Sequence, residues 1–222
     1  MSYGGVFMDK YLREPVNSLT HAIGAVLSLI GFIAMIVKVA LTNGNATEYL
    51  AICLFGIGMI LLYSASATYH SVISSDKVIK SLKKLDHSMI FLLIAGSYAP
   101  FCLIALHNSI GYGLFAAVGI ASVIGIIFKL VWINCPKWLS STIYIVVGWF
   151  AAFAIYPLSQ VLTTLSLVLL VAGGILYSIG GVIYALKKDA IKIGIFGSHE
   201  IFHIFIMLGT LCHFIAVFAF IL

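Results

Sequence analysis

Seven long apolar runs constrain the fold of this chain more than any other feature. They lie near residues 19–41, 49–72, 86–106, 110–132, 140–158, 161–186 and 195–220. A helix needs about 20 apolar residues to cross the hydrocarbon core of a bilayer, and each run is close to that length. Only 9% of the residues are charged, whereas a soluble domain averages about 25%. The sequence therefore predicts an all-α membrane protein, built as a bundle of seven transmembrane helices.

The segments between these runs are too short to form a second domain. They are Thr42–Glu48, Ile73–Leu85, His107–Ser109, Ile133–Leu139, Ser159–Gln160 and Lys187–Gly194. We therefore expect one transmembrane domain over residues 1–222, with residues 1–18 as a short cytoplasmic N-terminal segment. No small-residue cleavage site follows the first run, so this run is expected to remain as a membrane helix.

Basic residues lie almost entirely on one side of the predicted bundle. The N-terminal segment and the second, fourth and sixth connections contain or flank 11 of the 12 lysines and arginines, and only Lys38 lies toward the other side. Connections rich in lysine and arginine stay in the cytoplasm. We predict a cytoplasmic N-terminus, an exoplasmic C-terminus and a multi-pass location in the cell (plasma) membrane. The net charge of +5 then reflects membrane topology, and no nucleic-acid partner is expected.

Two histidines open the last apolar run, in the sequence Ser198-His199-Glu200-Ile201-Phe202-His203. Residues four apart lie on the same face of a helix, one turn from each other. A polar pair within hydrocarbon is costly, and such residues usually mark a functional site. A catalytic zinc ion usually has three protein ligands and one open position. If the two histidines belong to a zinc site, a third protein ligand must lie at the same depth in the membrane.

The second and third runs supply candidates at this depth. His70 lies near the end of the second run and Asp86 at the start of the third, and both of these ends are predicted to be cytoplasmic. The seventh run begins on the same side, with His199 and His203 about 6 and 12 Å along the helix. We predict that His70, His199 and His203 bind Zn²⁺. An interhelical polar cluster without a metal is the alternative.

A carboxylate and a hydroxyl accompany these histidines. Zinc lowers the pKa of a coordinated water to about 7, which provides a nucleophile at neutral pH. Asp86 is predicted to act as general base and then as proton donor to the leaving group, although a role as fourth ligand remains open. Ser66 lies one turn from His70, so its hydroxyl is placed to orient a ligand or hold a water.

The other intramembrane polar residues have structural interpretations. His87 and His213 are expected to form hydrogen bonds across the bundle. His213 lies about 15 Å beyond His203 along the helix and is rotated by about 80°, which excludes it as a ligand. Asn17 and His21 are predicted to close the bundle beneath the metal site by hydrogen bonds, together with Glu14.

Five motifs in this order resemble those of the haemolysin-III proteins, the bacterial branch of the progestin and adipoQ receptor family, which includes the adiponectin receptors. They are Glu14-x-x-Asn17-x-x-Thr20-His21, Ser66-x-x-x-His70, Leu85-Asp86-His87, Ile94-Ala95-Gly96-Ser97-Tyr98-Ala99-Pro100-Phe101 and Ser198-His199-Glu200-Ile201-Phe202-His203. The resemblance implies a seven-helix bundle with zinc on the three histidines, and with Asp86 and Ser66 beside the metal-bound water. The receptors are thought to hydrolyse lipid amides such as ceramide. Their long N-terminal region has no counterpart here, so hormone reception is not carried over.

The sequence therefore favours an integral membrane zinc hydrolase that acts on a lipid amide or ester, with a fatty-acyl lipid as its partner. Three alternatives remain: a non-enzymatic sensor with structural zinc, a lytic or pore-forming protein, and an intramembrane metalloprotease. The last arises because His199, Glu200 and His203 satisfy the H-E-x-x-H pattern, in which the glutamate is the general base. The resembling family accepts glutamine at this position, which suggests that Glu200 is dispensable.

Overall fold

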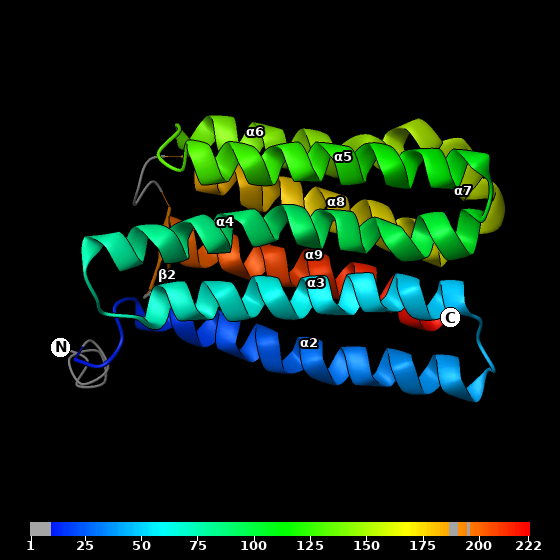
Figure 1. Ribbon diagram of the computed structural model, residues 1–222, viewed down its shortest axis with the longest axis horizontal. Helices are drawn as coiled ribbons and strands as arrows, with labels where there is room; N and C mark the ends of the chain where they lie inside the picture. Colours follow the sequence, from blue (N-terminus) through cyan, green and yellow to red (C-terminus); the bar gives the residue numbers. More distant parts are fainter. Residues whose placement is uncertain (1–9, 187–190, 195) are drawn as a thin grey trace.

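The computed structural model is a bundle of long helices (Figure 1), and it describes residues 10–186, 191–194 and 196–222. Within these residues, seven helical spans are long and apolar enough to cross a membrane. Five of these spans are single helices, and the third and fifth combine two and three helical segments. The elements in chain order are α2 (Pro15–Leu41), α3 (Ala46–Ser71), α4 (Asp76–Ala99) continued by the π-helical η1 (Pro100–Leu106), α5 (Ser109–Val131), α6 (Lys137–Gly148), η2 (Trp149–Ala154), α7 (Ile155–Val161), α8 (Thr164–Ala185) and α9 (Ser198–Phe220). The seven-helix membrane fold is confirmed.

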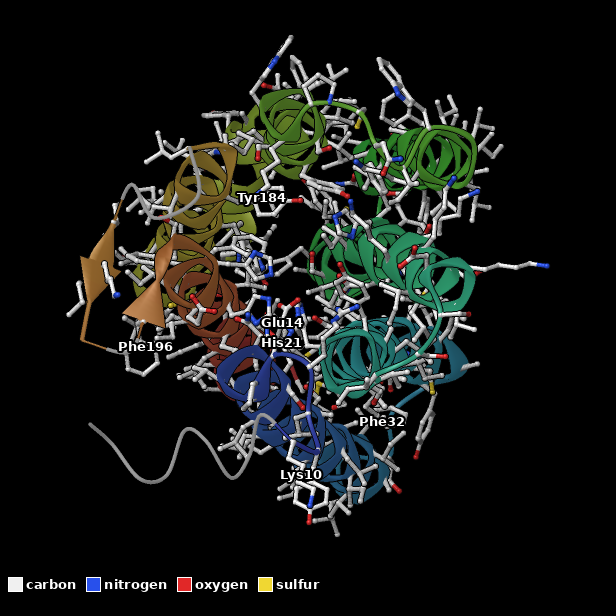
Figure 2. All side chains as sticks on the ribbon, turned by 90° about the vertical axis from the view of Figure 1, so that its left-hand side faces the viewer. Lys10, Glu14, His21, Phe32, Tyr184 and Phe196 are labelled. Carbon is white, nitrogen blue, oxygen red and sulfur yellow. The ribbon has the colours of Figure 1, made fainter. Side chains whose placement is uncertain are left out.

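Consecutive spans pack side by side, and α9 closes the bundle by packing against both α8 and α2. Seen from the end that holds the N-terminus, the helices form a ring (Figure 2). Residues such as Met35, Phe55 and Phe91 are fully buried inside it, whereas Ile30, Val26 and other large apolar side chains are exposed on the outside. Such an apolar exterior suits a helix that faces lipid, where the backbone polar groups are satisfied within the helix.

Glycine permits the closest approach between α3 and α4. A Cβ atom at Gly96 would lie 2.5 Å from the carbonyl oxygen of Leu54, which is backbone and cannot move aside. Small residues at such crossings let membrane helices pack backbone against backbone. This crossing fixes the positions of α3 and α4, which carry His70 and Asp86.

Prolines mark the irregular turns within two spans. The α-helix of the third span ends at Ala99, and the π-helical segment η1 begins at Pro100. In the fifth span, the 3₁₀ segment η2 precedes Pro157. A proline ring clashes with the carbonyl group four residues earlier, so the regular α-helix is interrupted before it. Each proline therefore lies beside a segment that is not regular α-helix, and the fifth span continues to Val161.

Several predicted boundaries were wrong. The third span begins at Asp76 rather than at residue 86, because its lysine-rich first turns are helical and extend beyond the ends of the neighbouring helices (Figure 1). Residues 159–160, predicted as a connection, belong to α7, and the break falls at 162–163. The seventh span begins at Ser198 rather than at residue 195, since β1 (Lys192–Ile193) and β2 (Phe196–Gly197) form a short antiparallel pair before it.

Parts of two predicted segments lie outside the described residues. These are residues 1–9 of the N-terminal segment and residues 187–190 of the last connection, together with residue 195. The described part of the N-terminal segment is partly helical, because α2 begins at Pro15. Proline suits the first position of a helix, where its missing N–H group would have no partner in any case.

Candidate metal centre

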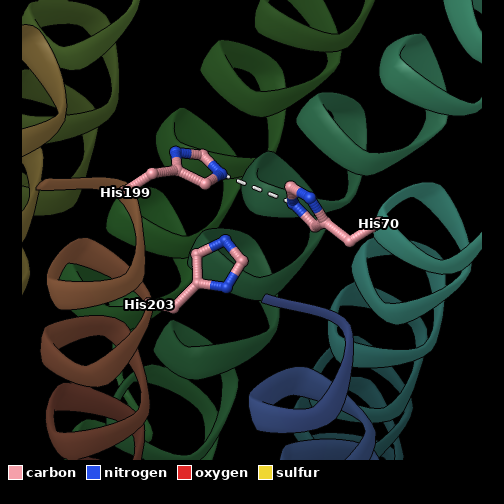
Figure 3. Close-up of side chains that lie close together, drawn as sticks. All are labelled: His70, His199 and His203. Atoms are coloured by element: carbon pink, nitrogen blue, oxygen red, sulfur yellow. Dashed lines mark hydrogen bonds between the residues drawn. The ribbon is translucent and has the colours of Figure 1, made fainter. Parts of the chain in front are cut away.

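Three histidines lie close together (Figure 3). They are at the end of the bundle that holds the N-terminus, where α3 ends and α9 begins (Figure 1). His70 lies in the last turn of α3, and His199 and His203 lie one turn apart at the start of α9. One nitrogen from each ring lies within 4.8 Å of the other two. His70 and His203 are each 1% exposed. The three residues that the sequence predicts to converge therefore do lie together in the structure, and the group could hold a metal ion.

The spacing of the donor atoms suits a tetrahedral metal ion. The Nε2 atoms of His70 and His199 are 3.4 Å apart. Two imidazole nitrogens bound to zinc at 2.0–2.1 Å, with a tetrahedral angle between them, are about 3.3–3.4 Å apart. The buried Nδ1 of His203 has no hydrogen-bond partner. The three-histidine set therefore fits Zn²⁺.

Glu14 orients one of the three rings. Its carboxylate Oε2 lies 2.7 Å from Nδ1 of His70, so Nδ1 donates its proton there and Nε2 is left to face the metal site. Backbone contacts fix this position, because the N–H groups of Arg13 and Glu14 donate to the carbonyl oxygens of Ser71 and His70 at 3.2 and 3.0 Å. A carboxylate behind a metal-binding histidine sets its tautomer and raises its basicity.

The charge state of Glu14 agrees with this role. Burial alone would raise the pKa of its carboxyl group, but the hydrogen bond with His70 and the charges of His70 and Arg13 outweigh burial and lower the pKa to about 2. The group is therefore ionised at neutral pH and accepts a hydrogen bond. From the sequence, Glu14 is predicted only to help close the bundle. Its spacing from His70 along the chain gives no indication of the contact.

Replacing Glu14 by alanine is expected to weaken metal binding by about 10- to 100-fold, since the His70 ring loses the group that orients it. Competition with a chromogenic chelator measures this affinity in purified protein. Glu48→Ala is the matched control, because it removes a carboxylate from the cap at the opposite end of α3. Equal affinities for the Glu14→Ala variant and the unsubstituted protein would contradict the orienting role.

His21 contacts the metal centre in a way that the sequence analysis missed. Its ring stacks on that of His203, with centroids 3.6 Å apart and planes at 12°. The side chain is 3% exposed, and neither ring nitrogen has a hydrogen-bond partner. The hydrogen bond predicted for His21 is therefore wrong, whereas Asn17 does close the bundle, donating to Glu14 at 3.1 Å and to Glu200 at 2.8 Å. Glu14 and His21 lie near the centre of the ring of helices (Figure 2).

Asp86 and Ser66 lie on the wall of a cavity beside the histidines. This internal cavity has a volume of about 110 Å³. Its lining includes Asp86, Ser66, His199 and His203, and it extends along α9 as far as His213, about 21 Å at the helical rise per residue. Most of the remaining lining is apolar or aromatic. Asp86 is 7% exposed and is not a member of the three-histidine group, which disfavours the alternative in which it is a fourth ligand.

Comparison with known proteins places the chain in a family. The family model described as "Haemolysin-III related" matches residues 10–214. The chain belongs to the haemolysin-III family. Its curated relatives include Hemolysin-3 of Bacillus cereus, 38% identical over 216 residues that cover 97% of this chain and 95% of the relative. A Hemolysin-3 homolog of Bacillus subtilis (strain 168) is 36% identical over 205 residues, 92% of each chain. The apolar spans and this membership together identify a multi-pass membrane protein.

Four of the five motifs that carry the haemolysin-III resemblance gather at one end of the bundle, whereas residues 94–101 lie farther along, in the last turns of α4 and the start of η1. The start of α2, the end of α3 and the start of α9 meet at that end, as the hydrogen bonds of Glu14 and Asn17 describe. α4 contributes Asp86 and His87 from turns within the helix, rather than from its start as predicted. Polar residues of the haemolysin-III motifs that lie far apart in the sequence therefore contact one another at this end of the bundle.

The structural interpretation of two other histidines is confirmed. Nε2 of His87 lies 3.1 Å from the hydroxyl of Tyr184, and Nε2 of His213 donates to the carbonyl oxygen of Leu170 at 3.1 Å. Both contacts cross between helices. His213 also packs against Gly173, where a Cβ atom would lie 2.3 Å from its ring. These contacts leave His213 outside the metal-binding group, as the sequence analysis expected.

Proposed function

We propose that this haemolysin-III protein is a zinc-dependent membrane hydrolase that cleaves a lipid amide or ester. The observation that carries the proposal is the position of Asp86, whose carboxylate lines the same cavity as His199 and His203. Burial, three imidazole donors and an adjacent carboxylate are the usual components of a hydrolytic metal site. The charge distribution of the sequence supports a cytoplasmic position for this site, within one domain over residues 1–222.

Each side chain has a defined task in the proposed reaction. Zn²⁺, when bound, supplies a Lewis acid and makes water at the site more acidic. Asp86 accepts a proton from the water whose oxygen bonds to the carbonyl carbon of the substrate. The bond from that carbon to nitrogen or oxygen then breaks, and Asp86 returns the proton to the leaving amine or alcohol. The products are a fatty acid and an amine or an alcohol, and the Ser66 hydroxyl orients the reacting water.

The internal cavity supports a lipid as the substrate. It extends from the histidines into the membrane-spanning part of the bundle, and residues such as Leu62, Ile94 and Ile206 line it. An acyl chain in this cavity would be shielded from water, and its carbonyl group would lie at the end where Asp86 is found. A lipid is therefore the partner that best fits both the shape and the polarity of the cavity.

Structural zinc is the main alternative, and the ligand set favours catalysis. Structural zinc sites are usually closed by four protein ligands, whereas catalytic sites keep a position open. Among the described residues, the metal-binding group has three members and adjoins a cavity.

The test of the proposed function is hydrolysis of a fluorogenic lipid amide and the matching ester by purified protein in liposomes. Release of product that stops with a chelator and returns with zinc supports the proposal. Absence of product from both substrates by zinc-loaded protein contradicts it.

Replacing Glu200 by glutamine distinguishes lipid hydrolysis from proteolysis. Glu200 accepts hydrogen bonds from the N–H of Gly197 at 2.9 Å and from Asn17, so both of its oxygens are engaged at the start of α9. A protease of the H-E-x-x-H class requires this carboxylate as general base and would lose about 10²- to 10⁴-fold in rate. We expect lipid turnover to change by less than about 3-fold, because the lost contact has only a modest net energy. A loss of the larger size would contradict our assignment of the base to Asp86.

A further inference from the structure

A second cavity lies at the same end of the bundle, outside the internal cavity. We call it the vestibule. It has a volume of about 510 Å³, and its charged lining residues are Glu14, Lys83, Lys137, Lys192 and Glu200. Lys137 and Lys192 are exposed, so the vestibule is open to water. The proposed hydrolysis does not use these lysines.

The vestibule and the internal cavity meet at the metal centre. Three residues line both spaces: His87, Tyr184 and His199. The hydroxyl of Tyr184 and Nε2 of His87 are 3.1 Å apart, so this pair forms part of the wall between the two cavities. A molecule that occupies both cavities must therefore pass beside His199. Because the internal cavity is mostly apolar and the vestibule is polar, such a molecule is an amphiphile.

The free charge of the vestibule is positive. Lys83, Lys137 and Lys192 come from three different elements, namely α4, α6 and β1. Within the part of the chain that the structure describes, the ion pairs involve only Arg13, His70 and His87 as cations, so none of the three lysines has a carboxylate partner. Lys137 instead lies 5.0 Å from the centre of the Tyr184 ring.

The two carboxylates of the vestibule are already engaged. Glu14 accepts from His70 and Asn17, and it contacts Arg13 at 3.4 Å. Glu200 accepts from Asn17 and from the N–H of Gly197. Neither group is therefore available to neutralise the lysines. A bound anion with several acceptor oxygens would satisfy this arrangement, since each lysine offers three donors.

We infer that the vestibule binds the phosphate group of an anionic lipid whose acyl chain occupies the internal cavity. A phosphate carries about 1.5 to 2 negative charges at neutral pH and three strong acceptor oxygens, and lysine is a common phosphate ligand. The inference rests on the proposed function for one point, that the bond to be cleaved lies between the two cavities beside His199. The binding site itself does not depend on turnover.

The general attraction of basic loops to anionic membranes does not account for this arrangement. Other lysines at the same end, including Lys10, Lys77 and Lys80, are exposed but do not line the vestibule. Their charges contribute to orientation in the membrane in the same way as those of the three vestibule lysines. Only the vestibule lysines converge on one space that adjoins the metal centre. Removing each set separately therefore distinguishes a defined site from surface charge.

Isothermal titration calorimetry on zinc-loaded protein in a neutral detergent tests the inference. The probes are octyl phosphate, inorganic phosphate and 1-octanol. We expect octyl phosphate to bind at least about 10-fold more tightly than either other probe, because only it combines the charge with the chain. The variant Lys83→Gln/Lys137→Gln/Lys192→Gln should lose about 30- to 100-fold in affinity for octyl phosphate. The matched control, Lys10→Gln/Lys77→Gln/Lys80→Gln, should stay within about 3-fold.

Each alternative outcome contradicts the inference. Equal affinity for inorganic phosphate assigns the site to a free anion, and an unchanged affinity in the vestibule variant assigns the phosphate to the zinc ion. An equal loss in the two triple variants shows surface charge alone. If the vestibule variant unfolds, the salt dependence of octyl phosphate binding to the unsubstituted protein replaces it, and no weakening between 0.05 and about 0.5 M salt contradicts the inference. Octyl phosphate has no amide or carboxylic ester bond, so its binding is independent of turnover. Tight binding by zinc-loaded protein that hydrolyses neither fluorogenic lipid would contradict the proposed function and leave the anion site standing.

Discussion

Replacing Asp86 by asparagine is expected to lower lipid hydrolysis by about 10²- to 10⁴-fold, the usual contribution of a general acid–base residue. Asparagine has nearly the same shape as aspartate but cannot accept the proton of the attacking water. Asp86 lines the internal cavity without joining the three-histidine group, so the metal content of the variant should be unchanged. The rate is measured with the fluorogenic lipid in liposomes, and zinc is measured in the same preparation.

Asp76→Asn is the matched control for this experiment. Asp76 lies in the first turn of the same helix and is exposed, so its replacement should leave both turnover and metal content intact. Turnover that survives Asp86→Asn would contradict the assignment of the base. Loss of zinc together with turnover would instead make Asp86 a metal ligand.

Replacing His203 by alanine is expected to remove most of the stabilisation that zinc gives the fold. A ligand at 1,000 times its dissociation constant stabilises the folded state by about 4 kcal/mol. Losing one of three donors should weaken zinc binding at least about 100-fold, so most of this stabilisation disappears at the same zinc concentration. Thermal unfolding in detergent, with and without added zinc, measures the difference. The unsubstituted protein should melt at a clearly higher temperature with zinc, and the variant should retain at most about a third of that increase.

His213→Ala provides the control on the same helix. His213 is also buried, and it donates to the carbonyl oxygen of Leu170. Its loss should lower the melting temperature in the absence of zinc but preserve the increase that zinc produces. An equal response to zinc in the His203→Ala and unsubstituted proteins would contradict the three-histidine site.

Much of the fold follows from the sequence because membrane helices obey simple length and charge rules. The same rules bring the end of α3 and the start of α9 to one end of the bundle, which is why His70, His199 and His203 could be assigned together. The start of α4 was misplaced for a physical reason. The segment that contains Lys77, Lys80 and Lys83 resembles a polar connection, but a helix can extend beyond the membrane and keep such residues in water.

The contacts around the metal centre could not be derived in this way. Glu14 precedes α2, and its contact with His70 depends on backbone hydrogen bonds to the end of α3. The stacking of His21 on His203 depends on how closely α2 and α9 pack. Helix lengths and charge patterns specify neither the contact between Glu14 and His70 nor the separation of the His21 and His203 rings. The two cavities likewise depend on which side chains leave space, so the convergence of Lys83, Lys137 and Lys192 became visible only in the structure.

X-ray absorption at the zinc edge, on the purified zinc-loaded protein, tests the central claim most directly. The account predicts one zinc ion per chain, held by three imidazole nitrogens at about 2.0–2.1 Å with one further oxygen. The imidazole contribution should fall in the His203→Ala variant. Zinc that binds substoichiometrically, or a first coordination shell without imidazole, would contradict the account.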